Sequence, residues 1–210
     1  MNPLTEKQLE KMLKQSPSGT DLDSAVQGLL ARAEREGLID VAYAPVDSPF
    51  GRLLIAKTDR GVVRLKLPTS RGHQVSDEEA LQNLATYVSP RLLESPKRLD
   101  EERRQLEEYF EGRRTGFDLA IDWSLSQGFT QRILQATAKV PFGQLATYRD
   151  MATKAGNERA VRAAGNALGS NHIPIVVPCH RIIRTGGALG GYTGGLERKE
   201  FLLKLEGVLL

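Results

Sequence analysis

The chain has 210 residues, 40% of them hydrophobic and 26% charged, which suits one or two globular domains with an ample core. The single cysteine, Cys179, excludes an internal disulfide bond and fits a reducing compartment. With three histidines and no second cysteine, a structural zinc site is not expected, and no metal is assigned. No apolar run approaches the ~18–20 residues that span a bilayer, and residues 1–15 lack the apolar centre of a secretory signal. We therefore expect a cytoplasmic protein without membrane contact.

The net charge of +3 is small, but the charges are distributed unevenly. Residues 125–210 contain 11 Lys or Arg and 5 Asp or Glu, a net charge of +6, whereas residues 1–124 contain 18 and 21, a net charge of −3. A basic C-terminal part is expected of a protein that binds the phosphates of a nucleic acid. Composition drift alone also produces such asymmetry, so the distribution supports nucleic-acid binding without establishing it.

Residues 1–37 are predicted to form a helical N-terminal extension. A Ser/Gly/Thr-rich break at residues 16–20 separates two apolar stripes with helical spacing, and Gly37 is placed to end the second helix. We interpret the stripes as surfaces that pack on the next domain rather than as surfaces for a partner.

Residues 38–122 are predicted to form a small α/β domain with an antiparallel sheet and a structural role. Three short β-rich runs indicate a three-stranded meander, and Asp-Arg-Gly at 59–61 suits the tight turn of a hairpin. The runs are residues 41–43, 51–56 and 62–67. Helices are expected at 77–87 and 100–111, and one more short strand at 117–121. No residue of this domain carries identifiable chemistry in the sequence.

Residues 123–210 are predicted to form a mainly helical domain, which makes the whole chain an α+β protein. Helices are expected at residues 131–139, 147–155 and 159–170, and a glycine-containing turn joins the last two into a helix-turn-helix. The last helix carries a row of small residues, namely Ala160, Ala163, Ala164 and Ala167. Such a row suits close packing against another helix, and it also suits entry into the narrow minor groove of DNA.

The cysteine follows an apolar run. Residues 173–177 are predicted to form a buried strand or extended segment, and Pro178 ends any regular hydrogen-bond ladder just before Cys179. His180 and Arg181 follow directly. A basic partner or a nearby positive charge lowers the pKa of a thiol and makes it nucleophilic, so this context favours a reactive cysteine over a small buried apolar side chain.

The segment Pro178-Cys179-His180-Arg181 resembles the active-site signature of the O6-alkylguanine-DNA alkyltransferases, also called methylated-DNA–protein-cysteine methyltransferases. The resemblance extends from about residue 129 to residue 207. It includes, in order, Pro141-Phe142-Gly143, Tyr148, Arg162, Asn171, Tyr192-Thr193-Gly194-Gly195, Lys199 and Glu206-Gly207. An ordered set of motifs at this spacing is more specific than the tetrapeptide alone.

The resemblance implies that Cys179 is the nucleophile and the permanent acceptor of the alkyl group. His180 takes the thiol proton through a water molecule in this scheme, and Glu206 orients the histidine. Tyr192 and Lys199 are expected near the target base, where a tyrosine hydroxyl stabilises charge on the departing guanine. The other residues expected around the substrate are Val177, Thr193, Gly194 and Arg184.

The same resemblance assigns residues to DNA. Because a base inside a duplex is out of reach, the target nucleotide must be flipped out. Arg162 matches the arginine that fills the vacated stack, Tyr148 matches the tyrosine that crowds the 3′ phosphate, and Asn171 matches the residue that ties the recognition helix to the active-site segment. Asn166 is larger than the residue often found there, which leaves open the face of the helix that meets DNA. The predicted DNA-facing set is completed by Ala160, Ala163 and Arg181.

The function implied is DNA repair by single-turnover transfer of the alkyl group of O6-alkylguanine to Cys179, with O4-alkylthymine as a further candidate substrate. The expected partner is double-stranded DNA that carries the lesion, and no cofactor is needed because DNA supplies the alkyl group. A monomer is expected, with cooperative assembly on DNA as an option. Two other functions stay open: a non-catalytic helix-turn-helix protein that binds lesions or regulates genes, and a cysteine hydrolase with repeated turnover.

Overall fold

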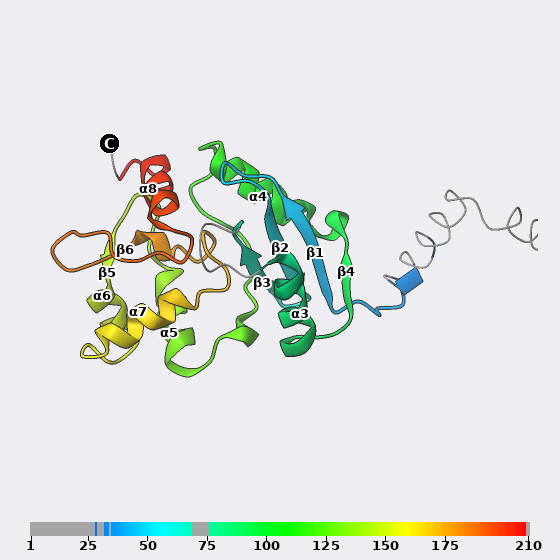
Figure 1. Cartoon of the computed structure of the whole chain (residues 1–210), viewed down its shortest axis with the longest axis horizontal. Coiled ribbons are helices and arrows are strands. Elements are labelled where there is room, and N and C mark those ends of the chain that lie inside the picture. The colour runs from blue at the N-terminus through cyan, green and yellow to red at the C-terminus, as the bar shows by residue number, and fades with distance from the viewer. Residues whose placement is uncertain (1–27, 29–31, 34, 69–75, 209–210) are drawn as a thin grey trace, which may run out of the picture. The chain divides into compact units, whose positions relative to one another are not determined.

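The structure is a computed structural model that describes residues 28, 32–33, 35–68 and 76–208 (Figure 1). The chain divides into two units, Met1–Ile39 and Asp40–Leu210, which are described separately. In the first unit, Gly37 follows helical residues and has φ +65°, so the predicted helix end at this glycine is confirmed. The rest of the predicted extension lies almost entirely outside the described residues.

The larger unit begins with a four-stranded sheet. Its strands are β1 (Val41–Val46), β2 (Leu53–Thr58), β3 (Gly61–Lys66) and β4 (Leu92–Glu94), in the spatial order β3-β2-β1-β4. The first three form an antiparallel meander, which confirms the prediction. The fourth pairs parallel to β1 and was not predicted, because a strand of three residues is too short to show a periodic pattern.

The connection to the second domain runs against β3. Gly61 has φ +126° at the start of β3, and a Cβ atom there would lie 2.2 Å from the carbonyl oxygen of Ala120, so only glycine fits this approach. The prediction of a strand at residues 117–121 is wrong. Only one isolated bridge forms, between Ile121 and Val62, and the rest of the segment is irregular.

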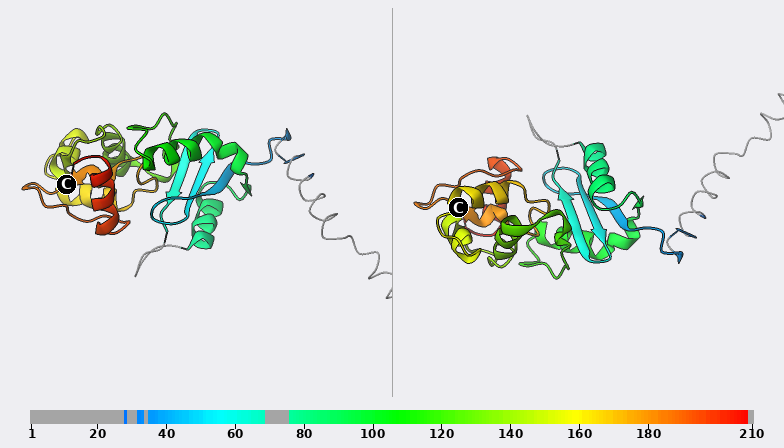
Figure 2. Two further views of the ribbon diagram at one scale, coloured as in Figure 1. Left: turned by 90° about the horizontal axis from the view of Figure 1, so that it is seen from above. Right: turned by 90° about the horizontal axis from the view of Figure 1, so that it is seen from below.

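Two helices cover opposite faces of the sheet (Figure 2). Helix α3 (Asp77–Tyr87) buries Leu84 against one face, and α4 (Asp100–Phe110) buries Leu106 and Tyr109 against the other. Because both faces are covered, β2 is buried along nearly its whole length rather than in alternation. Both helices begin and end close to their predicted positions, so these two predictions are confirmed.

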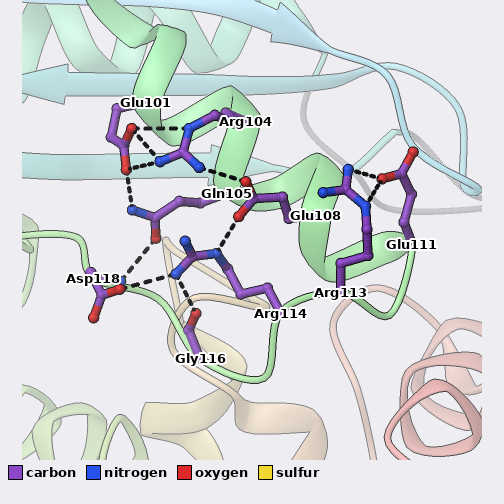
Figure 3. A network of polar contacts seen from close by, with 9 residues as sticks. All are labelled: Glu101, Arg104, Gln105, Glu108, Glu111, Arg113, Arg114, Gly116 and Asp118. Atoms are coloured by element: carbon purple, nitrogen blue, oxygen red, sulfur yellow. Dashed lines mark hydrogen bonds and ion pairs between the residues drawn. The ribbon is translucent and has the colours of Figure 1, made fainter.

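The outer face of α4 carries a network of ion pairs (Figure 3). Arg104 bridges Glu101 at 2.7 Å and Glu108 at 2.5 Å, and Arg114 bridges Glu108 at 2.8 Å and Asp118 at 3.1 Å. Single exposed ion pairs contribute little to stability, but this chain of pairs holds the loop after α4 onto the helix.

The part of the larger unit that follows residue 123 contains the predicted helix-turn-helix, which is confirmed. Helices α5 (Gly128–Thr137), α6 (Tyr148–Lys154) and α7 (Val161–Gly169) pack against one another. The start of α6 is fixed by a capping box in which Thr147 and Asp150 exchange hydrogen bonds between side chain and backbone.

The remaining elements complete an α+β fold around one core. The hydrophobic cluster runs from the sheet to the helix-turn-helix and includes Tyr109, Ile133 and Leu202 from three different helices. The short elements are η1 (Pro96–Leu99), η2 (Trp123–Leu125), η3 (Cys179–Arg181), the parallel pair β5 (Ala146–Thr147) and β6 (Ile182–Ile183), and helix α8 (Leu196–Leu205). Within the described part of the chain, every helix is too short or too polar to cross a bilayer.

Candidate active site

Residues 173–177, which precede the cysteine, are buried as predicted, but they form a tight turn, so the prediction of a strand or extended segment is wrong. The N–H of Val177 donates to the carbonyl of Ile173 at 2.9 Å, and Ile175 has φ +75°, a rare conformation for a β-branched residue. From the sheet, the N–H of Leu65 on β3 donates to the carbonyl of His172 at 2.8 Å. The first domain therefore supports the turn that leads to the thiol.

Cys179 lies at the start of η3 and is 6% exposed. Asn171 Nδ2 donates to Cys179 Sγ at 3.1 Å and to the carbonyl of Val177 at 2.9 Å, while Asn171 Oδ1 accepts from the N–H of Ile173 at 3.0 Å. Burial raises the pKa of the Cys179 thiol, and the Asn171 hydrogen bond and the charge of Lys199 oppose this shift only in part. The predicted lowering of the thiol pKa is therefore wrong, and the thiol needs a base.

His180 is fully buried next to that thiol, and its Nε2 lies 2.8 Å from Glu206 Oε1. Because an ionised carboxylate only accepts hydrogen bonds, Nε2 carries the proton and Nδ1 is the free acceptor. His180 Nδ1 is buried and has no hydrogen-bond partner among the described residues. Burial lowers the pKa of His180 despite the opposing effect of Glu206, so the imidazole is neutral and able to take a proton.

Glu206 lies directly after α8 and accepts hydrogen bonds from residues before and after residue 123. Its Oε1 accepts from the hydroxyl of Tyr109 on α4 at 2.6 Å, and its Oε2 accepts from Arg181 Nε at 2.9 Å. Burial by itself raises the pKa of Glu206, but hydrogen bonds from His180 and Arg181 outweigh burial and lower the pKa to about 2. The carboxylate is ionised at any pH at which the protein is expected to work.

Arg181 contradicts the prediction that it meets DNA. It is 5% exposed, pairs with Glu206, and donates through Nη1 to the carbonyl of Val140 at 2.6 Å. These contacts engage the guanidinium inside the protein.

The thiol opens into a cavity of about 200 Å³. Its walls come from α6, α7 and the loop before α8, and they are Tyr148, Gly165, Leu168, Gly169, Gly191, Tyr192 and Thr193. A side chain at Gly190 would meet the ring of Tyr148, with a Cβ atom 2.7 Å from its hydroxyl oxygen. Thr193 Oγ1 donates to the carbonyl of Gly169 at 3.0 Å and joins the loop to the end of α7. The cavity brings together three of the predicted residues with the cysteine: Tyr148, Tyr192 and Thr193.

Three residues predicted around the substrate do not line this cavity. Val177 is fully buried and contributes its carbonyl to Asn171, and Arg184 is exposed on the loop that follows β6. Gly194 is packed between Leu67 and the ring of Tyr192, with no room for a Cβ atom. The sequence places these residues near the cysteine, but the direction in which each faces depends on the tertiary fold.

Tyr192 lines the cavity and carries an unused donor. Its hydroxyl is buried and has no hydrogen-bond partner among the described residues. Burial raises the pKa of Tyr192 well above its ordinary value, so the hydroxyl keeps its proton.

Lys199 is buried on α8 and acts on the thiol only through its charge. Its Nζ donates to the carbonyl of Ile182 at 2.6 Å and to the carbonyl of Leu189. These two bonds join β6 to the loop of residues 184–195, which precedes α8. Burial lowers the pKa of Lys199 to about 8, and the nearby Cys179 opposes the shift.

Helix α7 has a packed face and an outer face. Ala164 and Ala167 are buried against the neighbouring helices, so the packing interpretation is correct for these two. The residues predicted to face DNA from this helix and its N-cap are exposed or only half-buried, namely Ala160, Arg162 and Ala163, and Asn166 is exposed as well. The outer face is therefore nearly flat apart from Arg162 and Asn166.

The sequence did not identify Tyr109, whose hydroxyl contacts Glu206 from the other domain. It lies in an ordinary amphipathic helix, and no local pattern distinguishes it from a core tyrosine. Gly165, Leu168, Gly169 and Gly191 were also missed as cavity walls. Among the described residues, no group of three or more His, Cys, Asp or Glu side chains is arranged to hold a metal ion.

Two family descriptions match this chain. Residues 41–123 match the ribonuclease-like domain of 6-O-methylguanine DNA methyltransferase, and residues 128–208 match its DNA binding domain. The constitutive methylated-DNA–protein-cysteine methyltransferase of Bacillus subtilis (strain 168) is 38% identical over 165 residues, which cover 78% of this chain and 94% of the relative. The regulatory protein ada of Salmonella typhimurium is 35% identical over 182 residues, but the match covers 50% of that protein.

Solved structures agree with these matches. A crystal structure of the Mycobacterium tuberculosis O6-methylguanine methyltransferase superposes with a TM-score of 0.65 at 34% identity, covering 79% of this chain and 92% of that chain. A crystal structure of Mycobacterium tuberculosis OGT in complex with DNA superposes with a TM-score of 0.63 at 35% identity and the same coverage.

Proposed function

The chain belongs to the 6-O-methylguanine DNA methyltransferase family and repairs DNA by alkyl transfer to protein, and we propose that Cys179 is the acceptor. The observation that carries this proposal is the arrangement of three buried groups. A protonated thiol is followed in the chain by a buried, neutral histidine, whose Nε2 lies 2.8 Å from an ionised glutamate.

The proposed step is a displacement at the alkyl carbon. The thiol proton of Cys179 passes to His180 Nδ1 through a water molecule, and Glu206 stabilises the imidazolium that forms. Sγ then forms a bond to the alkyl carbon while the bond from that carbon to guanine O6 breaks. The electron pair of the broken bond stays with the base, which regains a proton. DNA supplies the alkyl group, so the step needs no cofactor.

We propose that Tyr192 donates a hydrogen bond to the departing base. Its buried, unpartnered hydroxyl supports this role, because a donor held in a dry cavity stabilises developing negative charge strongly. Lys199 is proposed to favour the thiolate by its charge and to hold the loop that carries Tyr192.

The proposed partner is double-stranded DNA that carries O6-alkylguanine, with O4-alkylthymine as a second substrate. The outer face of α7 supports entry into the minor groove, because Ala163 is small and exposed. Arg162 is proposed to fill the stack after the base flips, and Tyr148, at the rim of the cavity, to crowd the 3′ phosphate. We propose that the protein acts as a monomer in the cytoplasm, where a free thiol stays reduced.

A short duplex that contains one O6-methylguanine tests the proposal. After incubation, intact mass should rise by about 14 Da, one methyl replacing one hydrogen on a nucleophilic sulfur. A Cys179→Ser variant should bind the duplex and gain no mass. If the wild-type protein binds without any gain, the protein is a lesion-binding or regulatory protein. If substrate is consumed repeatedly without an adduct, it is a hydrolase.

A further inference from the structure

A second cavity lies beside the cavity of the thiol. It has a volume of about 180 Å³, and the two cavities share Gly169 and Thr193 in their walls. The second cavity is also lined by Asn171, whose amide donates a hydrogen bond to Sγ of the thiol. Its opposite wall is β3 of the first domain, which contributes Arg64 and Lys66.

The described walls of this cavity contain cationic and neutral groups but no Asp or Glu. Arg64 is half-buried, its Nε is buried without a hydrogen-bond partner, and it forms no ion pair with any described residue. Lys66 differs, because its Nζ pairs with Asp77 at 2.7 Å. Burial lowers the pKa of Arg64, and the charge of Glu79 on α3 opposes this shift in part. Glu79 makes no direct contact with Arg64. The charge of Arg64 is thus left without a direct partner.

A buried N–H donor without a partner is unfavourable, because it loses hydration and gains no compensating hydrogen bond, and the Nε of Arg64 is such a donor. An anion that entered the cavity would supply the missing partner. Arginine suits an oxyanion in particular, because its planar group binds carboxylate or phosphate oxygens with two parallel hydrogen bonds. His172 lines the same cavity. Burial and the charge of Arg64 lower the pKa of His172, so its imidazole is neutral and adds no charge to the cavity.

We propose that this cavity is a second substrate subsite, in which Arg64 binds an oxyanion that enters together with the lesion. The inference rests on the proposed alkyl transfer at Cys179. Two parts of the substrate carry such a group: a carboxylate on the alkyl group itself, and a phosphate of the DNA backbone. The contact of Asn171 with both the cavity and the thiol favours a carboxylate on the alkyl group, because that group must lie against Sγ during transfer.

The test compares three duplexes of one sequence, which carry O6-methylguanine, O6-carboxymethylguanine or the neutral O6-(carbamoylmethyl)guanine. Rates of adduct formation on Cys179 are measured for the full chain, for Arg64→Gln and for the charge-retaining Arg64→Lys. The matched control is Arg52→Gln, which removes the same charge from an exposed position of the same domain outside the cavity. Melting temperatures of all variants exclude an effect on folding.

If the alkyl group supplies the oxyanion, Arg64→Gln lowers the ratio of carboxymethyl to carbamoylmethyl rates about tenfold, as expected for one lost charged hydrogen bond. Arg64→Lys then retains most of the ratio. If the DNA backbone supplies the oxyanion instead, Arg64→Gln leaves the ratio of carboxymethyl to carbamoylmethyl rates unchanged. The variant then binds all three duplexes more weakly, and the slope of log affinity against log salt becomes shallower by about 0.9. The inference is overturned if Arg64→Gln matches Arg52→Gln in every assay. If the wild-type protein gains no methyl group on Cys179 from the O6-methylguanine duplex, the proposed function is overturned instead.

Discussion

Glu206 accepts hydrogen bonds from Tyr109 of the first domain and from His180 and Arg181 of the second. One ionised carboxylate therefore fixes the tautomer of the histidine, neutralises a buried guanidinium and joins the domains. The same residue links the protonation of the site to the stability of the fold, because a buried ion pair that loses one charge leaves the other uncompensated.

The pH dependence of unfolding tests this link. The pKa of Glu206 is about 2 in the folded protein, below the ordinary value of 4.5, so the native state holds the ionised form more strongly than the unfolded state does. Its contribution, about 3 kcal/mol, is therefore present above pH ~4.5 and is lost as the pH falls towards 2. Denaturant unfolding at a series of pH values measures it. Glu206→Gln should be less stable at neutral pH and should lack this part of the slope, and an unchanged slope would contradict the assignment.

Among the elements, α4 connects the surface of the first domain to the catalytic carboxylate. Arg114, in the loop that follows α4, pairs with Glu108 on the outer face of the helix and with Asp118 in the loop itself. The same loop places the ring of Phe117 against that of Tyr109, with ring centroids 5.2 Å apart. The hydroxyl of Tyr109 then reaches Glu206. We expect Tyr109 to be a positioning residue, which acts on the thiol through Glu206 and His180.

Tyr109→Phe removes one hydroxyl from this path. We expect a loss of about 1–1.5 kcal/mol of stability, the usual value of one hydrogen bond, and slower alkyl transfer. Because that hydrogen bond lowers the pKa of Glu206, the acid-side loss of stability should be smaller in the variant and should be complete at a higher pH. Phe117→Leu is the control, since it alters the packing of the same ring and keeps the hydroxyl. If both variants lose stability with the same pH profile, the hydroxyl has no positioning role.

Helix α7 permits a separate test of DNA binding. Ala163→Glu places a negative charge on the exposed face, which should leave the melting temperature nearly unchanged because surface changes fall within about 0.5 kcal/mol. Transfer from duplex DNA should slow at least tenfold, whereas transfer from the free base O6-benzylguanine should not change. Gln82→Glu, on the exposed side of α3, adds the same charge away from the helix-turn-helix. Equal effects of the two variants on duplex substrates would argue against α7 as the DNA-binding helix.

At the scale of the whole molecule, the sequence predicted the fold class, the meander, the helix-turn-helix and the contact between His180 and Glu206. These depend on local patterns and on ordered motifs. It did not predict that residues 173–177 turn, that Arg181 faces inward, or that burial raises the pKa of the thiol. Each of these depends on which side chains the two domains bring together, and no local pattern records that.

Alkylation should lower the stability of the whole molecule. An added methyl group on Sγ has the cavity on one side but crowds the amide of Asn171 on the other, which weakens the hydrogen bond between them at a cost of about 1 kcal/mol. Calorimetry of the protein before and after reaction should show a lower melting temperature for the methylated form. A mock-treated sample with undamaged duplex is the control, and an equal melting temperature would contradict the packing described for the thiol.

Peptide mapping by mass spectrometry after reaction with excess O6-methylguanine duplex tests the central claim most directly. We predict one methyl group per chain, on the peptide that contains Cys179, with no further gain when fresh duplex is added. Methyl groups on other peptides, or continued loss of lesions from an unmodified protein, would contradict transfer to this thiol.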